Sequence, residues 1–108
     1  MNLKDFKLES QREYWAKALV ELGKKRKDIV VLSADLSSSV KTSLFAKDFP
    51  ERHFNVGIAE QNMMSIAAGL AACGKTAFAS TFAAFGTGRV YDQIRQSIAY
   101  PKLNVKII

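Results

Sequence analysis

The sequence predicts a three-layer α/β/α fold built on a parallel sheet. Strand patterns alternate with helix patterns along the chain, and such alternation is typical of parallel sheets covered by helices. The first strand pattern, residues 28–33, is an almost continuous apolar run, as expected of a strand that is buried on both faces. The length of 108 residues suits one domain at most, with a modest core.

The first half of the chain contains two predicted helices and one predicted strand. Ser10, with a glutamate three positions later, forms a capping-box pattern that predicts a helix start. Apolar residues follow at helical spacing, and we expect Gly23 to end this helix. After the strand at 28–33 come a loop with three serines and a short amphipathic helix pattern at 40–49, which Pro50 ends.

The second half of the chain repeats the alternation. A short strand pattern at 52–56 passes through a glycine into a helix rich in small residues at 61–73. Residues 75–80 form the next strand, 91–100 a helix that a proline ends, and 103–108 the beginning of a last strand. Because such a strand normally continues into further strand–helix units, we expect the sequence to be a truncated part of a longer polypeptide.

Composition and charge exclude several classes of function. The net charge is +6, but the basic run at 24–27 falls at a predicted helix end, where cations face solvent, and no aromatic residues interleave with it. We therefore expect no nucleic-acid partner and consider phosphorylated sugars the better class of anionic ligand. No apolar stretch approaches the roughly 18–20 residues that span a bilayer, and the N-terminus lacks a signal-peptide core, which favours a cytoplasmic protein without a membrane partner.

Two single residues have structural interpretations. Cys73 has no second cysteine to form an internal disulfide with, and its alanine- and glycine-rich surroundings predict a small buried apolar residue. His53, the one histidine, precedes a strand, and we expect it to be structural.

The carboxylate of Glu60 is the most informative side chain in the sequence. It falls at a strand-to-helix junction, near the positive end of the helix dipole and the free backbone N–H groups there. Its neighbours are apolar: Val56, Ile58, Met63 and Met64. Position alone favours a surface residue in the first helical turn. The alternative is a buried carboxylate with a partner that requires it, such as a ring nitrogen that must be protonated or polarised.

Three segments are predicted to follow the carboxyl ends of strands, where open α/β sheets bind their ligands. They are Asp35 with the serines after it, residues 57–60 and residues 81–85. Phe82 and Phe85 could contact a flat heteroaromatic ring by offset stacking, although ordinary core phenylalanines fit the pattern equally well. Asp35 suits such a site and equally suits an N-cap of the following helix.

Three motifs, taken together, resemble the pyrimidine-binding domain of transketolases, which are thiamine-diphosphate enzymes. Residues 54–63, Phe-Asn-Val-Gly-Ile-Ala-Glu-Gln-Asn-Met, resemble the glutamate-bearing motif of that family. Residues 32–36, Leu-Ser-Ala-Asp-Leu, resemble the segment after its first strand, and 80–85 with 91–95 resemble the aromatic segment that packs on the aminopyrimidine ring. Residues 86–90 between them are one residue longer than the usual pattern, and their two glycines predict a bend.

The resemblance implies that two chains together bind the cofactor. It covers roughly residues 10–108, so we expect residues 1–9 to be an N-terminal extension and 10–108 to be part of a pyrimidine-binding domain. No Gly-Asp-Gly motif for a metal and diphosphate is present, which favours a split transketolase whose diphosphate-binding domain is a separate chain. The cofactor would be thiamine diphosphate with Mg²⁺ or Ca²⁺, and the partner domain, not this chain, would bind the metal ion. We expect a homo- or hetero-oligomer.

The resemblance also implies roles for single residues. Five residues match positions that contact the cofactor: Glu60, Asp35, Ile58, Phe82 and Phe85. In the family, the glutamate that matches Glu60 is catalytic, because its hydrogen bond to N1′ of the aminopyrimidine promotes loss of the thiazolium C2 proton. Residues that match Arg12 and Ser39 contact the phosphate of the sugar substrate.

The implied function is transfer of a two-carbon ketol unit between phosphorylated sugars, as in the pentose phosphate pathway. 1-Deoxyxylulose-5-phosphate synthase and the β subunits of 2-oxoacid dehydrogenases remain alternatives, because they share Ala-Glu-Gln motifs such as residues 59–61. A non-catalytic α/β interaction module is an alternative of another class. Because the cofactor bridges two subunits in the resembled family, we expect the chain alone to be inactive.

Overall fold

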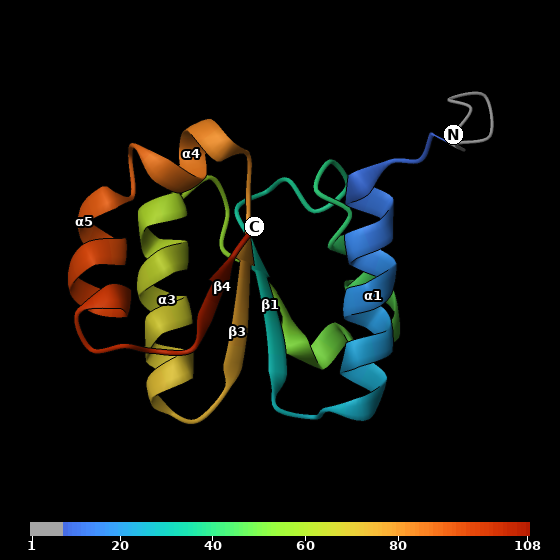
Figure 1. The fold of residues 1–108 in the computed structure, drawn as a ribbon, viewed down its shortest axis with the longest axis horizontal. Coiled ribbons are helices and arrows are strands. Elements are labelled where there is room, and N and C mark those ends of the chain that lie inside the picture. The colour runs from blue at the N-terminus through green and yellow to red at the C-terminus, as the bar shows by residue number, and fades with distance from the viewer. Residues whose placement is uncertain (1–7) are drawn as a thin grey trace, which may run out of the picture.

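Four parallel strands form a sheet between two layers of helices in the computed structural model, which describes residues 8–108 (Figure 1). Their order is β2-β1-β3-β4, and each neighbouring pair is parallel. The strands are β2 (His53–Asn55), β1 (Ile29–Ser33), β3 (Thr76–Ser80) and β4 (Val105–Ile107). The predicted α/β fold with a parallel sheet is confirmed, and all carboxyl ends of the strands meet at one edge.

Helices cover both faces of the sheet. On one face lie α1 (Gln11–Lys25) and α2 (Ser43–Asp48), and on the other lie α3 (Glu60–Ala72), α5 (Tyr91–Gln93) and its continuation η3 (Ile94–Ala99) (Figure 1). Two shorter helical pieces are η2 (Pro50–Arg52) and α4 (Ala83–Thr87).

The strand β1 supplies the core on both faces, because successive side chains of a strand point in opposite directions. Ile29 and Val31 pack with Leu19 and Phe45 under α1 and α2. Val30 and Leu32 pack into the larger cluster under α3, which also contains Met63, Met64, Ala67 and Ala68. All five residues of β1 are buried, as the apolar run predicted.

The first helix begins where the sequence predicts but ends later. α1 starts after Ser10, whose carbonyl accepts a hydrogen bond from the amide of Glu13 at 3.1 Å. The side chain of Ser10 makes no capping hydrogen bond, so the predicted capping box is not formed. Gly23 is buried inside the last turns, and a β-carbon there would lie 2.6 Å from a ring carbon of Phe45. Gly23 therefore permits close packing and does not end the helix.

Three other helical segments differ from expectation. The helix expected at 40–49 is shorter, because Lys41 has a left-handed φ of 66° that an α-helix does not accommodate. The two glycines that predicted a bend instead belong to α4 and its end, with Gly86 buried inside that helix. The helix expected at 91–100 is present, but Ile94–Ala99 winds as a π-helix.

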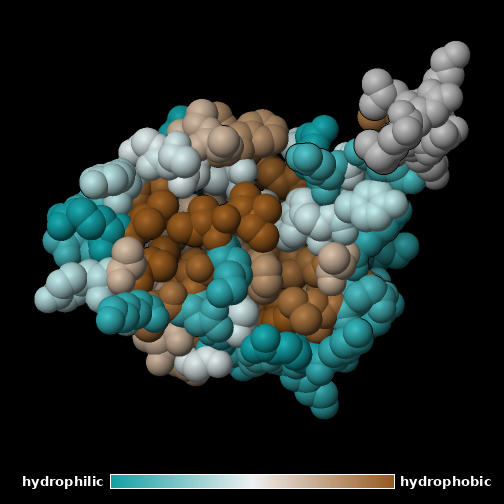
Figure 2. Space-filling view, in the orientation of Figure 1, coloured by the Kyte–Doolittle hydropathy of each residue, from teal (hydrophilic) through white to brown (hydrophobic). Residues whose placement is uncertain are grey.

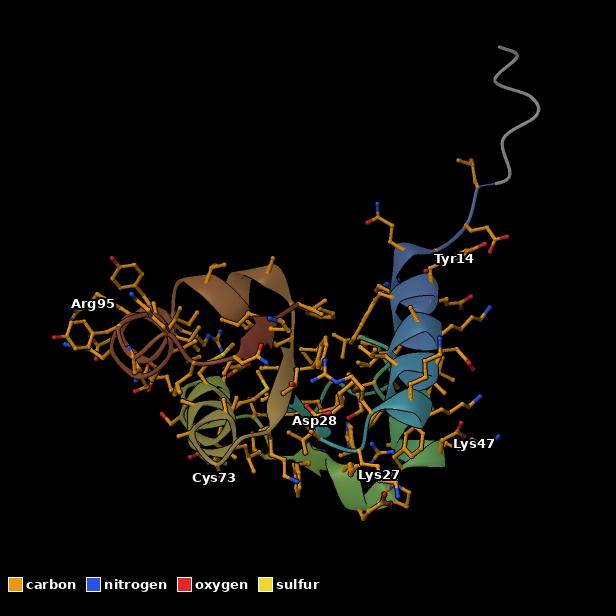
Figure 3. All side chains as sticks on the ribbon, turned by 60° about the horizontal axis from the view of Figure 1, so that its bottom comes forward. Tyr14, Lys27, Asp28, Lys47, Cys73 and Arg95 are labelled. Atoms are coloured by element: carbon orange, nitrogen blue, oxygen red, sulfur yellow. The ribbon has the colours of Figure 1, made fainter. Side chains whose placement is uncertain are left out.

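The prediction that Cys73 is buried is wrong. Cys73 follows α3 as its C-cap residue and is exposed. It lies at the end of the helix that is far from the carboxyl ends of the strands (Figure 3). The stripe of α3 that faces the sheet ends with Ala71, so the helix directs the next residues toward solvent.

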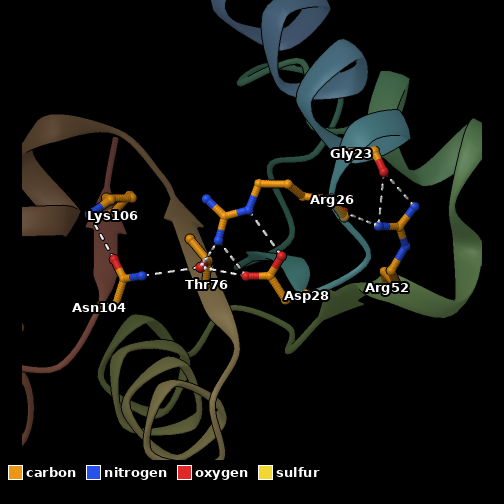
Figure 4. A network of polar contacts seen from close by, with 7 residues as sticks. All are labelled: Gly23, Arg26, Asp28, Arg52, Thr76, Asn104 and Lys106. Atoms are coloured by element: carbon orange, nitrogen blue, oxygen red, sulfur yellow. Dashed lines mark hydrogen bonds and ion pairs between the residues drawn. The ribbon is translucent and has the colours of Figure 1, made fainter.

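A polar network joins three strands at the amino-terminal edge of the sheet (Figure 4). Asp28, just before β1, accepts hydrogen bonds from Arg26 and from Thr76 Oγ1, the latter at 2.8 Å. Asn104, just before β4, donates to Thr76 Oγ1 at 3.1 Å. The hydrogen bonds from Arg26 and Thr76 lower the pKa of Asp28 to about 2. This edge is therefore occupied by structural contacts.

The carboxyl end of α1 is capped by an arginine from η2. Arg52 donates to the carbonyl oxygens of Gly23, at 3.2 Å, and Arg26, at 3.0 Å (Figure 4). Its guanidinium carbon also lies 4.0 Å from the ring centroid of Phe49. These contacts satisfy terminal carbonyl groups of the helix that have no partner within it.

Apolar side chains gather along the β4 edge of the sheet, in the middle of the view in Figure 2. Ile107 and Ile108 are partly exposed there, and a hollow between α1 and β3 is lined by Trp15 and Phe78. Among residues 8–108, no helix has both the length and the apolar character that crossing a membrane requires.

The packing of Gly23 predicts opposite effects for two glycine substitutions in helices. Gly23→Ala should lower the free energy of unfolding by about 1–3 kcal/mol, because the new methyl group overpacks the buried ring of Phe45. Gly69→Ala in α3 should instead stabilise by up to about 1 kcal/mol, because nothing lies within 4 Å of its β-carbon position. Urea unfolding of both variants measures the difference, and equal effects would contradict the packing described here.

Candidate functional site

A hollow of about 170 Å³ lies at the carboxyl edge of the sheet, where the segments after β1, β2 and β3 meet. It is lined by Ala34, Asp35, Leu36, Ile58, Glu60, Phe85 and Arg89. Four of the five residues that the resemblance assigned to the cofactor thus line one space, although they come from three distant segments, and the fifth, Phe82, does not line it. The hollow lies beside β1 and β3, between which the strand order reverses, and this is where open α/β sheets bind ligands.

Glu60 is the first residue of α3, and only 4% of its surface is exposed. The interpretation as a surface residue in the first helical turn is therefore wrong. The position is favourable for a negative charge, because the free N–H groups and the positive end of the dipole lie at this end of the helix. A buried carboxylate nevertheless requires a partner, since an unpaired buried charge is strongly destabilising.

The partner of Glu60 is Arg89, which no pattern in the sequence indicated. Arg89 Nη1 donates to Glu60 Oε2 at 3.3 Å. The guanidinium carbon of Arg89 lies 4.2 Å from the ring centroid of Phe85, so the cation also stacks on that ring. The requirement of a buried glutamate for a cation was the available signal, but sequence spacing did not show which of the arginines would reach it.

One side chain fixes the two loops that border the hollow. Asn55 Oδ1, at the end of β2, accepts hydrogen bonds from the amides of Asp35, at 2.8 Å, and Gly57, at 3.1 Å. Asn55 Nδ2 donates to Asp35 Oδ1 at 3.2 Å. Asp35 has a left-handed φ of 59°, and the hydrogen bonds with Asn55 support this conformation. The interpretation of Asp35 as an N-cap is wrong, because Thr42 precedes α2 in that position.

The two phenylalanines face different spaces. Their ring centroids are 6.0 Å apart with an angle of 36° between the planes. Phe85 is partly buried and lines the hollow of Glu60, whereas Phe82 is 41% exposed and lines a second hollow. Neither is an ordinary core residue. The helix α4, which begins after Phe82, separates them by one turn.

The second hollow, of about 370 Å³, lies between the start of α1 and the end of β3. Arg12, Trp15 and Phe82 are among its lining residues. Arg12 Nη1 donates to the backbone carbonyl of Ser39 at 3.1 Å, so the two residues that the resemblance assigned to a phosphate are in contact, but only Arg12 lines the hollow. Thr81 Oγ1 is buried beside this hollow and has no hydrogen-bond partner within residues 8–108.

His53 lies at the beginning of β2 and does not line the hollow of Glu60. Burial lowers its pKa, which favours the neutral form. Within the part of the chain that the structure describes, no group of three or more His, Cys, Asp or Glu side chains gathers as a metal site would require.

Comparisons with known proteins agree on one family. Residues 10–108 match the family "Transketolase, pyrimidine binding domain". A protein described as a transketolase C-terminal section, from Methanocaldococcus jannaschii, is 58% identical over 90% of this chain and 31% of that protein. A 6-deoxy-6-sulfo-D-fructose transketolase subunit from a Clostridium species is 43% identical over 90% of this chain and 30% of the subunit.

Two further relatives bear on the assembly and on the alternatives. A solved structure described as a split-gene transketolase, an inactive beta4 tetramer, has a TM-score of 0.81 and 67% identity, and the match covers 89% of this chain and 32% of that one. A 1-deoxy-D-xylulose-5-phosphate synthase from Dictyoglomus thermophilum is 38% identical over 94% of this chain and 16% of the enzyme. The chain thus spans about a third, or less, of the length of these relatives.

The hydrogen bonds of Asn55 with Asp35 predict a pH-dependent effect of changing Asn55. Asn55→Ala and Asn55→Asp both lack the amide donor, but Asn55→Asp keeps an oxygen that accepts from the amides of Asp35 and Gly57 and places a second carboxylate about 3 Å from the first. The stability of Asn55→Asp relative to Asn55→Ala should therefore rise as the pH falls from 7 toward 3, since protonation of one carboxyl group removes the repulsion. Urea unfolding at both pH values measures this. A difference between the two variants that does not change with pH would contradict the contact.

Proposed function

This chain belongs to the transketolase pyrimidine-binding domain family, and on that premise we propose that it is the pyrimidine-binding part of a split, thiamine-diphosphate-dependent transketolase. Membership of the family implies binding of thiamine diphosphate. The observation that carries the proposal is the buried Glu60 carboxylate, which shares a hollow with the Phe85 ring at the ligand edge of the sheet.

The residues around the hollow fit a flat, nitrogen-containing ring. Glu60 offers carboxylate oxygens that accept a hydrogen bond from a protonated ring nitrogen, and Phe85 offers a ring face for stacking. The planar cation of Arg89 contacts both groups at once, which supports a site for a planar donor. Ile58, with 79% of its surface exposed, stands at the rim, where a bound ring would cover it.

Thiamine diphosphate, when bound, supplies an electron sink for breaking and forming carbon–carbon bonds. The contribution of this chain is to place and protect the pyrimidine end. Glu60 holds the proton at the ring nitrogen N1′, and its burial strengthens that hydrogen bond because little water competes. Phe85 fixes the plane of the ring, and Asp35 borders the hollow next to β1.

The diphosphate and its Mg²⁺ or Ca²⁺ ion belong, in this proposal, to a partner subunit that carries the diphosphate-binding domain. Two relatives of the chain are described as a C-terminal section and as a subunit, which supports such a division. The active form would be an oligomer, and the isolated chain would bind the cofactor only weakly. We assign it to the cytoplasm, with a role such as that of transketolases in the pentose phosphate pathway.

The second hollow suits the phosphate end of a sugar substrate. Arg12 provides a charge-assisted donor at its rim, and its contact with the Ser39 carbonyl holds the guanidinium beside the hollow. This arrangement supports a phosphorylated substrate, and the proposed transketolase function makes phosphorylated ketoses and aldoses the proposed class. A 1-deoxyxylulose-5-phosphate synthase remains the second candidate, because a relative of that activity is 38% identical, whereas the relative described as a transketolase section is 58% identical.

The proposed role of Glu60 predicts a large catalytic effect without loss of the fold. In the enzyme assembled with its partner subunit, Glu60→Gln should lower kcat by about 10²–10⁴-fold, because an amide cannot share a proton with the ring nitrogen. Cofactor affinity should change less, since the amide still forms a hydrogen bond. Steady-state kinetics with Glu51→Gln, a change of an exposed glutamate, provides the control. Near-normal turnover of Glu60→Gln would contradict the proposal.

The proposed phosphate contact predicts a substrate-dependent effect. Arg12→Ala should raise KM for phosphorylated sugars by a factor equivalent to about 1.5–3 kcal/mol, the range for hydrogen bonds to charged groups. KM for a short, non-phosphorylated hydroxyketo acid should barely change. Lys17→Ala removes an exposed cation from the same helix and serves as the control for net charge. Equal losses for both kinds of substrate would instead mean that Arg12 is structural.

A further inference from the structure

The Arg89 guanidinium lies where a flat ring would have to lie in order to contact both Glu60 and Phe85. One of its nitrogens is 3.3 Å from Glu60 Oε2, and its central carbon is 4.2 Å from the centroid of the Phe85 ring. A guanidinium is planar, cationic and rich in N–H donors, as is a protonated aminopyrimidine. Both groups would use the same carboxylate and the same ring face, so they exclude each other.

We propose that Arg89 closes the pyrimidine site of this chain while no ring is bound, and that its side chain withdraws as the ring enters. The inference rests on the function proposed above, because it identifies the ring as the aminopyrimidine of thiamine diphosphate. It adds a regulatory step: ring binding and release of Arg89 form one equilibrium, and the strength of the Arg89 contacts sets the affinity for the ring.

The backbone of Arg89 is fixed, so the movement is confined to the side chain. Gln61 Nε2 donates to the carbonyl oxygen of Arg89 at 2.7 Å, which ties this backbone to the first turn of α3. The next residue, Val90, is fully buried in the core under α3. The Arg89 side chain itself is 48% exposed, so a rotation about its own bonds carries the guanidinium into solvent.

The closed state has a physical advantage for the free protein. Glu60 keeps a cationic partner whether the site holds Arg89 or a protonated ring, so the buried carboxylate is not left unpaired in either state. The consequence is competition: the contacts of the Arg89 side chain with Glu60 and Phe85 must be broken before a ring binds. Arg89 thus stabilises the free chain and weakens its affinity for the ring.

The test uses thiamine, which contains the aminopyrimidine but no diphosphate, titrated into the chain and its variants by NMR. Arg89→Ala should bind thiamine about tenfold more tightly than the unchanged chain, equivalent to about 1.4 kcal/mol. Arg89→Lys should fall between the two, because lysine keeps the charge but has no planar face to stack on Phe85. Weaker or unchanged binding by Arg89→Ala would overturn the proposal and make Arg89 either a positioning residue or a bystander.

Arg95→Ala is the matched control for charge. Arg95 projects from η3 on the outer side of the helix layer and pairs with Asp92 at 3.0 Å, away from the hollow of Glu60 (Figure 3). Arg95→Ala should leave the affinity for thiamine unchanged. If it raised the affinity as much as Arg89→Ala does, the lower net charge would explain both results, and the proposal that Arg89 closes the site would be wrong. Circular dichroism checks folding. If Arg89→Ala does not fold, Arg89→Lys must by itself bind thiamine more tightly than the unchanged chain.

A double variant separates this inference from the function on which it rests. If the pyrimidine ring contacts Glu60, adding Glu60→Ala, which removes the hydrogen-bonding group altogether, to Arg89→Ala should remove most of the gain in affinity. Loss of the gain supports both proposals. A gain that persists without the carboxylate contradicts the role of Glu60 and hence the proposed function. If the affinity for thiamine depends on Glu60 but does not change with Arg89, only the proposal that Arg89 closes the site is wrong.

Discussion

Burying the carboxylate of Glu60 costs free energy unless its charge is stabilised, and the arrangement of the site follows from that requirement. The start of α3 provides backbone N–H groups and the positive end of the helix dipole, and Arg89 provides a cation at 3.3 Å. The ring of Phe85 also contacts this cation, with its centroid 4.2 Å from the guanidinium carbon. A carboxylate, a cation and an aromatic face are thereby held together in a largely apolar hollow, where a planar donor can replace the cation.

The two ends of the parallel strands have different roles. Side chains at the amino ends hold the strands together, whereas the loops at the carboxyl ends border the candidate ligand site. At the amino-terminal edge, Asp28 and Thr76 join β1, β3 and the approach to β4 through hydrogen bonds. At the carboxyl edge, Asn55 holds the loops after β1 and β2 by contacts with Asp35 and Gly57. Because these contacts fix the backbone, the side chains of Glu60 and Phe85 are not required to hold the loops.

The sheet and much of the site could be predicted from the sequence because they depend on local patterns. Features that arise only from long-range contacts or from packing could not be predicted. The buried run of β1 and the junction before α3 are local patterns, so they predicted both elements and the convergence of Asp35, Glu60 and Phe85. The contact of Arg89 with Glu60 joins residues 29 positions apart and follows no local period. Gly23 matches the pattern of a helix end, whereas its actual requirement, close approach to Phe45, exists only in the packed structure.

Whether the hollow of Glu60 and Phe85 receives an aminopyrimidine ring is decided by locating the ring of bound thiamine. Intermolecular nuclear Overhauser effects between the pyrimidine protons of thiamine and the chain report contacts even when binding is weak. A ring in this hollow should give effects between these protons and both the ring of Phe85 and the methyl groups of Ile58. Effects confined to Trp15 and Phe82, which line the hollow beside Arg12, would place the ring elsewhere and contradict the proposed site.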